Sequence, residues 1–194
     1  MKKLIVLGMF LVCLCMVTGI VSAETPWDTG NVNIVLGQKS LNRNDWKPVG
    51  HQFEVGFEGD YRQINWPVNI VVGFTQSRDT GTATIHGKVD VTGSTMEYLI
   101  GIKKIWDNSQ DIHPFISGGA SMITAKFAVM HLGKTESDND TVPGYWIGTG
   151  AYWTVSKTVN IGAEIKYSSA RVTLFGERGD AGGAHYGVIM GYHY

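Results

Sequence analysis

The part of the chain that follows residue 23 contains no cysteine, because Cys13 and Cys15 are the two cysteines of the sequence. Disulfide bonds and cysteine-ligated metal sites are therefore excluded there. The same part has no apolar run long enough to cross a bilayer as a helix. If it crosses a membrane, it must do so as a closed β-barrel, since a closed barrel satisfies every backbone polar group without water.

An excess of charge of one sign is also lacking. After Lys2 and Lys3 are set aside, 14 basic side chains face 17 acidic ones, which leaves a net charge of −3. This balance excludes the basic surface that nucleic-acid binding needs, so no nucleic-acid partner is expected. The six histidines show no metal-binding pair motif. We therefore expect neither a metal site nor a cofactor.

The first 23 residues have the pattern of a cleaved signal peptide. Lys2 and Lys3 precede an almost entirely apolar run from Leu4 to Val17, and Val21 and Ala23 stand at positions −3 and −1 of a cleavage site. Residues 1–23 are thus predicted to be removed, and residues 24–194 to form a single domain.

The end of the chain alternates strictly between two kinds of side chain. One set holds bulky apolar and aromatic residues, and the interleaved set holds small or polar ones. The bulky set is Tyr186, Val188, Met190, Tyr192 and Tyr194. Because successive strand residues point to opposite faces, this pattern predicts a strand with one apolar face, directed either to a soluble core or to lipid.

Eight alternating segments are separated by polar clusters. They run over about 32–41, 51–62, 68–77, 92–105, 114–130, 145–155, 159–174 and 184–194. The connections after segments two, four and six are short, whereas those at 42–49, 78–91, 132–144 and 176–183 are longer. This alternation predicts an all-β fold, an eight-stranded antiparallel transmembrane up-and-down β-barrel, with both termini on the short-turn, periplasmic side. A soluble β-sandwich is the alternative.

Aromatic residues near the short turns and the chain end fit an interfacial girdle of such a barrel. The predicted girdle consists of Tyr61, Trp66, Trp106, Trp153, Tyr192 and Tyr194. A second girdle is predicted on the long-loop side, formed by Trp46, Tyr145, Phe175 and Tyr186.

If the apolar set faces lipid, a charged set must face the lumen. These residues are Lys39, Glu54, Glu58, Arg62, Glu97, Lys103, Glu164 and Lys166. Acids and bases are nearly balanced in this set, and because unpaired buried charges are prohibitive, we expect them to pair and to plug the lumen. A narrow passive channel is the alternative.

The chain resembles the small eight-stranded outer-membrane β-barrel proteins, such as the OmpA-like transmembrane domain. The resemblance lies in the leader, in the segments 114–120 and 159–168, and in the ending 182–194. It implies location in the bacterial outer membrane, contact with outer-membrane lipids, and recognition of the last strand by the outer-membrane assembly machinery. A monomer with no catalytic function is expected, acting structurally or by binding an extracellular ligand at its long loops.

One enzyme of similar architecture, lipid A deacylase, provides a further alternative. The segment 166–170 is similar to that family's His-x-Ser-Asn motif, but Lys166 stands in place of the histidine. Ser168 is therefore predicted to lack a general base. The alternation of the strand also directs Ser168 to the lumen, away from lipid. Two loop motifs are expected to be ordinary: Arg178-Gly179-Asp180 as a tight turn, and the acids at 136, 138 and 140 as a solvated loop.

Overall fold

A computed structural model describes residues 29–41, 43–84, 88–106, 112–131, 134–156 and 158–194. The predicted signal peptide lies outside these residues. Over the described ranges, no helix has the length and apolar character of a membrane span.

Eight strands form one closed barrel. They are β1 (Thr29–Ser40), β2 (His51–Arg62), β3 (Asn69–Thr84), β4 (Lys88–Ile105), β5 (Ile112–His131), β6 (Lys134–Thr154), β7 (Val159–Ser169) and β10 (Gly183–His193). A four-residue helix, α2 (Arg43–Trp46), lies between β1 and β2. A separate two-stranded sheet, formed by β8 (Arg171–Leu174) and β9 (Glu177–Asp180), lies between β7 and β10.

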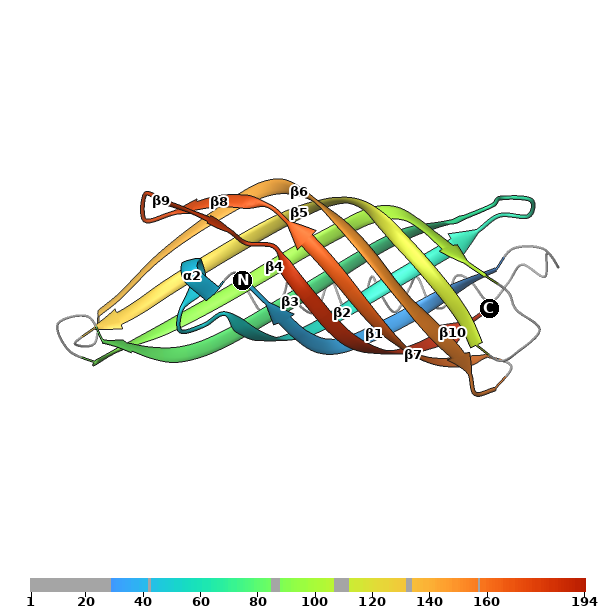
Figure 1. Cartoon of the computed structure of the whole chain (residues 1–194), viewed down its shortest axis with the longest axis horizontal. Helices are drawn as coiled ribbons and strands as arrows, with labels where there is room; N and C mark the ends of the chain where they lie inside the picture. The colour runs from blue at the N-terminus through green and yellow to red at the C-terminus, as the bar shows by residue number, and fades with distance from the viewer. Residues whose placement is uncertain (1–28, 42, 85–87, 107–111, 132–133, 157) are drawn as a thin grey trace, which may run out of the picture.

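Each strand pairs antiparallel with its sequence neighbours in the barrel, and β1 pairs with β10 to close it. The eight-stranded up-and-down barrel predicted from the alternating segments is thus confirmed (Figure 1). The closing strands also meet at the chain end, because Gly30 and Tyr194 exchange two backbone hydrogen bonds of 3.1 Å. The start of β1 and the end of β10 therefore lie together, at the end of the barrel that carries the short turns.

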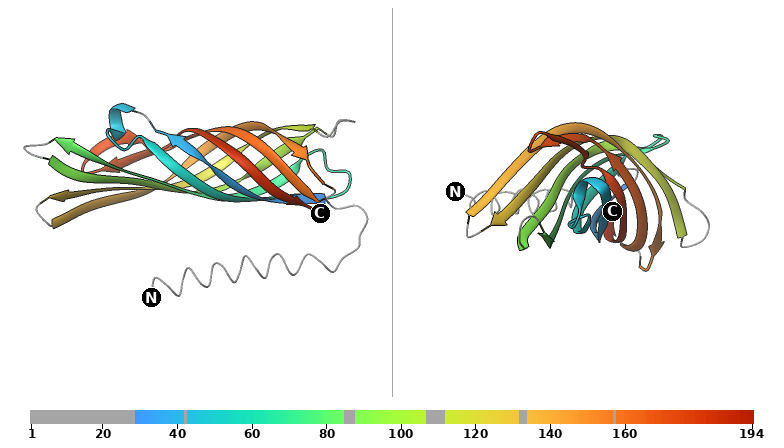
Figure 2. Two further views of the ribbon diagram at one scale, coloured as in Figure 1. Left: turned by 90° about the horizontal axis from the view of Figure 1, so that it is seen from below. Right: turned by 60° about the vertical axis from the view of Figure 1, so that its left-hand side comes forward.

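Four strands are much longer than a membrane crossing requires. The strands β1, β2, β7 and β10 have 11 or 12 residues, whereas β5 has 20 and β6 has 21. About 9–11 residues span a bilayer as a tilted strand. The surplus of β3–β6 forms a four-stranded sheet that continues beyond the barrel at its long-loop end (Figures 1 and 2).

We call this sheet the extension. It includes most of the segments 78–91 and 132–144, which were predicted to be loops, so that prediction was wrong. Both segments are mostly strand, and their ladders pair Thr84 with Lys88 and His131 with Lys134. Their side chains are polar on the outer face and mixed on the inner face, so they lack the apolar alternation that marks the membrane part. Pairing persists because the register is already set by the strands below.

The predicted seventh strand, 159–174, is also wrong at its end. The strand β7 stops at Ser169, and β8 then pairs with β9 instead of continuing the barrel. Two acids of β6 hold this hairpin: Asp140 accepts the backbone N–H of Thr173 at 2.8 Å, and Asp138 accepts that of Phe175 at 2.7 Å. The acidic segment that was predicted to be a solvated loop is therefore part of β6, and two of its acids bind the β8–β9 hairpin.

The outer wall of the barrel is apolar, as expected of a surface that faces lipid. Alternate residues of every strand are large, hydrophobic and exposed, among them Ile100 at 60%, Ile147 at 60% and Met190 at 62%. Such a continuous apolar surface would be a severe liability in water. In a membrane it is the outward-facing band of a β-barrel.

Candidate functional site

The interior of the barrel is the candidate site, because its polar side chains converge there. All eight residues predicted to face the lumen do so. Seven are buried, namely Lys39, Glu54, Glu58, Glu97, Lys103, Glu164 and Lys166, and Arg62 is half-buried at the periplasmic end. They form successive layers along the barrel axis, beneath an apolar cover.

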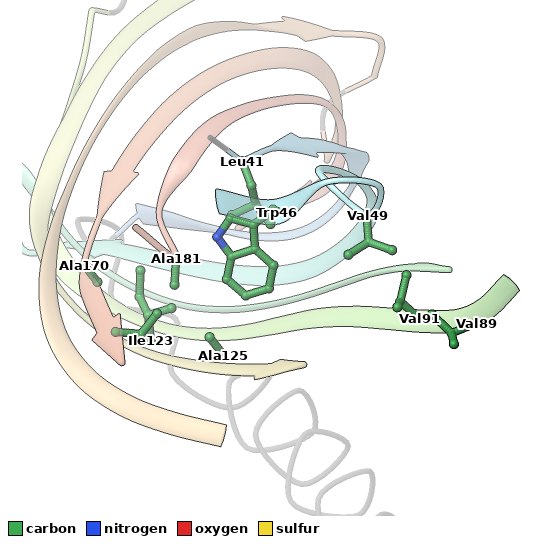
Figure 3. Close-up of a cluster of buried hydrophobic side chains, with 10 residues drawn as sticks. Leu41, Trp46, Val49, Val89, Val91, Ile123, Ala125, Ala170 and Ala181 are labelled. Atoms are coloured by element: carbon green, nitrogen blue, oxygen red, sulfur yellow. The ribbon is translucent and has the colours of Figure 1, made fainter. Parts of the chain in front are cut away.

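The cover is an apolar cluster at the extracellular mouth (Figure 3). The loop that follows β1 folds inward and places Leu41, Trp46 and Val49 against the inner faces of the extension and of the segments beside β8 and β9. The indole N–H of Trp46 donates to the backbone oxygen of Asp180 at 2.8 Å. Trp46, predicted for the outer girdle, is therefore buried in the mouth, because the loop turns into the barrel instead of lying along the membrane.

A charged layer lies beneath this cover. Lys39 forms an ion pair with Glu97 and also donates to the hydroxyl of Thr95 at 2.9 Å and to the backbone oxygen of Ala181 at 2.7 Å. The residue Ala181 belongs to the apolar cluster, so Lys39 links the two layers. The ammonium group of Lys39 is thus fully enclosed and has three acceptors, two from β4 and one from the segment after β9.

The same layer contains a serine, a histidine and a glutamate in line. Ser168 Oγ lies 2.9 Å from Nε2 of His185, and Nδ1 of His185 lies 2.7 Å from Oε2 of Glu54. The prediction that Ser168 lacks a general base is therefore wrong, because β10, the strand beside β7, supplies a histidine. A signal was available in the sequence, since His185 is a polar residue on the inward set of the last strand.

This alignment has the order of nucleophile, base and acid found in serine hydrolases. However, Ser168 has no exposed surface, and Glu97 Oε1, 3.2 Å from its hydroxyl, competes with His185 for its single proton. The apolar cluster lies above this layer, and the remaining charges lie below it. In this arrangement Ser168, His185 and Glu54 form a buried hydrogen-bonded network.

Two further ionic layers follow toward the periplasm. Lys166 lies 3.7 Å from Glu164. Deeper, Lys103 pairs with Glu58, lies 3.6 Å from Asp60 and donates to the hydroxyl of Tyr152 at 2.8 Å.

Aromatic rings close the space beside Lys103. The rings of Phe115 and Tyr152 stack at 4.8 Å, and the ammonium of Lys103 lies 4.7 Å from the centroid of Phe115. This stack needs a glycine at position 150, because a Cβ there would meet the Phe115 ring at 2.6 Å. The ion pair and the aromatic stack thus lie side by side in the lower lumen.

A small polar cavity of about 80 Å³ opens at the periplasmic end. Arg62 lines this cavity together with the histidines and amides of five other strands. Its lining includes Asn31, Asn69, His113, Tyr152, Asn160 and His193. The asparagines were not predicted as lumen residues from the sequence, although Asn31 and Asn69 both donate to Asp60, at 2.9 and 2.6 Å. They compensate this buried carboxylate without adding charge.

The predicted periplasmic girdle lies on the outer surface near the short turns and the chain end. Five of its members are exposed, namely Tyr61, Trp66, Trp106, Trp153 and Tyr192. The sixth, Tyr194, is half-buried because its ring lies over Gly30, where an added Cβ would come within 2.7 Å of Tyr194 Cζ. Tyr145 and Tyr186 lie exposed on the opposite rim, whereas Phe175 lies at the turn of the β8–β9 hairpin.

The tripeptide Arg178-Gly179-Asp180 is a strand, not the predicted tight turn. The Asp180 carboxylate accepts hydrogen bonds from Ser169 Oγ at 3.0 Å, Ala170 N at 3.1 Å and Gly182 N at 2.8 Å. These hydrogen bonds fix the Asp180 carboxylate against the segments that flank the hairpin. Among the described residues, no group of three or more His, Cys, Asp or Glu side chains could hold a metal ion.

No family model and no curated protein matches this chain. Solved structures do match. The attachment invasion locus protein Ail of Yersinia pestis, in complex with the heparin analogue sucrose octasulfate, superposes with a TM-score of 0.59 at 17% identity, over 87% of this chain and 99% of Ail. Neisserial surface protein A gives a TM-score of 0.53 at 14% identity, over 86% and 94% of the two chains.

A major outer membrane protein from Thermus thermophilus has a TM-score of 0.57 at 7% identity, over 86% of this chain and 98% of that one. At these identities the likeness concerns the fold. The expected resemblance to small eight-stranded outer-membrane β-barrels is confirmed at that level, and it agrees with the apolar outer wall in supporting the outer membrane as the location.

Proposed function

We propose that this protein is a monomeric, integral outer-membrane β-barrel with a sealed lumen, which binds an extracellular ligand through its extension. One observation carries the binding role: β5 and β6 pair over their whole length, although about half of that length suffices to cross a bilayer. Paired strands hold this surplus in a defined shape. Such a rigid sheet outside the membrane suits recognition better than it suits transport.

The layers inside the barrel support a sealed lumen. An eight-stranded barrel has room inside for little more than its own side chains. Here the apolar cover, the Lys39–Glu97 pair and the Lys103 layer with its aromatic stack follow one another along the axis. A hydrated ion would have to displace paired charges at two levels and apolar side chains at a third.

Planar-bilayer recording tests the sealed lumen. We expect the wild-type protein to show little steady conductance, because an apolar layer and two hydrogen-bonded ionic layers follow one another along the axis. Long-lived, voltage-insensitive openings of the wild-type protein would support the narrow passive channel instead.

The binding role is tested by shortening the extension without touching the membrane part. In the variant, residues 82–90 and 128–137 are each replaced by Asn-Gly, a two-residue turn that suits a β-hairpin. The remaining strands would end at the pairs Gly81–Val91 and Phe127–Asp138. The barrel is expected to assemble and to migrate faster on an unheated gel than after boiling, as closed barrels do.

Heparin is the first ligand to try, because Ail, a structural neighbour, is seen with a heparin analogue. Cells that display the wild-type protein would be compared with cells that display the shortened variant on heparin-coated surfaces. We expect the wild-type cells alone to adhere. Equal adhesion of the two kinds of cell, at equal amounts of the protein on their surfaces, would show that the extension does not bind the glycan.

A further inference from the structure

One row of laterally paired residues on the outside of the barrel changes from aromatic to cationic. The row passes across six strands from β10 to β5. Its members are Tyr186, Gln38, Phe53, Arg78, Ser94 and Lys126. Tyr186 and Phe53 belong to the apolar wall, and they are 52% and 64% exposed. Because barrel strands are tilted by about 35–45°, such a row climbs as it passes from strand to strand. The change from Phe53 to Arg78 is the one expected where such a row leaves the hydrocarbon layer.

We propose that Arg78, Ser94 and Lys126 form a site for the phosphate headgroup of a lipid in the outer leaflet. This inference rests on the outer-membrane orientation of the proposed function, but not on the extension as a binding sheet. The three residues lie side by side on β3, β4 and β5, with the two cations on either side of the serine. All three are on the outward set of their strands.

The spacing suits one phosphate group. Neighbouring strands lie about 4.8 Å apart, so the Cα atoms of Arg78 and Lys126 are about 10 Å apart. Both side chains are long enough to converge on a group held over Ser94, whose hydroxyl adds a third donor. The planar guanidinium of arginine donates two parallel hydrogen bonds to a phosphate, and lysine adds a mobile positive charge.

The charges around the row favour an anion at this place on the barrel wall. At the corresponding level of the other strands, the outward-facing wall residues that the structure describes are uncharged or histidine. They are Ser40, His51, Thr141, Ser169 and Ala184. Of the nearby carboxylates, Asp138 and Asp140 are on the inner set of β6, where they bind the β8–β9 hairpin. Asp90 is on the outward set of β4, but it lies four residues beyond Ser94, which is about 13 Å along the strand. Among these wall residues the positive charge thus lies on the β3–β5 side, whereas other exposed cations at this end, Lys47, Arg171 and Arg178, belong to the loop after β1 and to the β8–β9 hairpin.

A lipid fits better than a soluble anion because an apolar surface leads directly to the cations. Four residues toward the membrane on β3 and β4, the rings of Phe74 and Tyr98 lie 5.2 Å apart. Phe53 pairs directly with Arg78 on the other side. An acyl chain along these rings would bring its headgroup phosphate to the level of Arg78 and Lys126, as aromatic belts and basic residues do at membrane interfaces.

The test uses full-length mature protein in nanodiscs that contain phosphatidylcholine with a minor fraction of phosphatidic acid. Native mass spectrometry measures the ratio of the two lipids that stay bound after the disc is removed. We expect the wild-type protein to enrich phosphatidic acid. Removing each cation should reduce that enrichment about fivefold, so R78Q/K126Q should lose most of it. The matched control K88Q/K134Q removes two exposed cations near the hairpin tips and should retain it.

Three outcomes would overturn the proposal. One is no enrichment by the wild-type protein, and another is an equal loss in the two double variants, which would indicate charge attraction without a site. The third is displacement of the lipid by millimolar inorganic phosphate, which would indicate a site for free anions. Faster migration on an unheated gel shows that each variant is folded. The heparin assay uses a variant that keeps all three residues, so failure of one proposal is distinguishable from failure of the other.

Discussion

The ammonium group of Lys103 lies 2.8 Å from the hydroxyl of Tyr152 and is fully enclosed by the barrel. It also pairs with Glu58 and lies 3.6 Å from Asp60, so two buried carboxylates depend on this one cation. The next residue, Lys104, belongs to the outward set of the same strand. Two adjacent lysines thus occupy opposite environments, which offers a matched comparison.

We predict that Lys103→Met destabilises the folded barrel by about 3–5 kcal/mol, because it leaves Glu58 and Asp60 without their cation. Lys104→Met should change the free energy of unfolding by no more than about 0.5 kcal/mol. Urea titration of refolded protein, read as the fraction that migrates in the folded position on unheated gels, measures both. Equal effects of the two substitutions would mean that the lower ionic layer does not stabilise the barrel. The double variant K103M/E58Q should recover part of the loss.

Trp46 is predicted to hold the cover over the extracellular mouth. Trp46→Ala removes a fully buried indole, and such truncations cost about 3–5 kcal/mol when the site cannot collapse. Here the lost free energy is that which holds the loop after β1 in the mouth. Proteinase K should therefore cut the variant within residues 43–50 much faster than it cuts the wild-type protein. Trp66→Ala, at an exposed periplasmic position, serves as the control.

Conductance of the W46A variant should stay low, because the layers of Lys39 and Lys103 remain beneath the opened mouth. A large, steady conductance in this variant would mean that the apolar cover alone seals the lumen.

Ser168 is predicted to be unreactive despite its histidine. A fluorophosphonate reagent should leave the folded wild-type protein unlabelled, since the serine has no exposed surface. Ser168→Ala should cost about 1–3 kcal/mol, because it leaves buried polar partners unsatisfied. Labelling that disappears in both S168A and H185Q would instead identify a catalytic serine, and the buried-network interpretation would be abandoned.

Deletion of Tyr194 is predicted to affect assembly more than stability. The deletion removes the two backbone hydrogen bonds with Gly30, and each such bond contributes about 0.5–1.5 kcal/mol net. This loss is small for a closed barrel, so refolding of purified protein into detergent should proceed nearly as before. In cells, where the resemblance implies that the assembly machinery recognises the last strand, the amount in the outer membrane should fall markedly. A comparable loss in both settings would show that Tyr194 acts through stability alone.

The strand count, the barrel and the division of residues between wall and lumen were all predictable from the sequence. A residue on a strand points to one of two faces, so the alternation in 184–194 and in 51–62 assigns each side chain without knowledge of its partners. The eight lumen residues were identified in this way. The same rule indicated that Ser168 faces inward.

Other features follow from contacts between segments that are far apart in the sequence, and the tertiary structure alone decided them. The pairing of Lys39 with Glu97 and of His185 with Glu54 depends on the lateral register and on the closure of the barrel, which bring the four residues into one layer. The extension was not predicted because its strands lack the apolar alternation of the membrane part. Its strands pair because they continue the register that the membrane part has already set. Trp46 was misplaced for a related reason: an aromatic residue in a loop has no periodicity to show whether the loop turns outward to the membrane or inward to an apolar cavity.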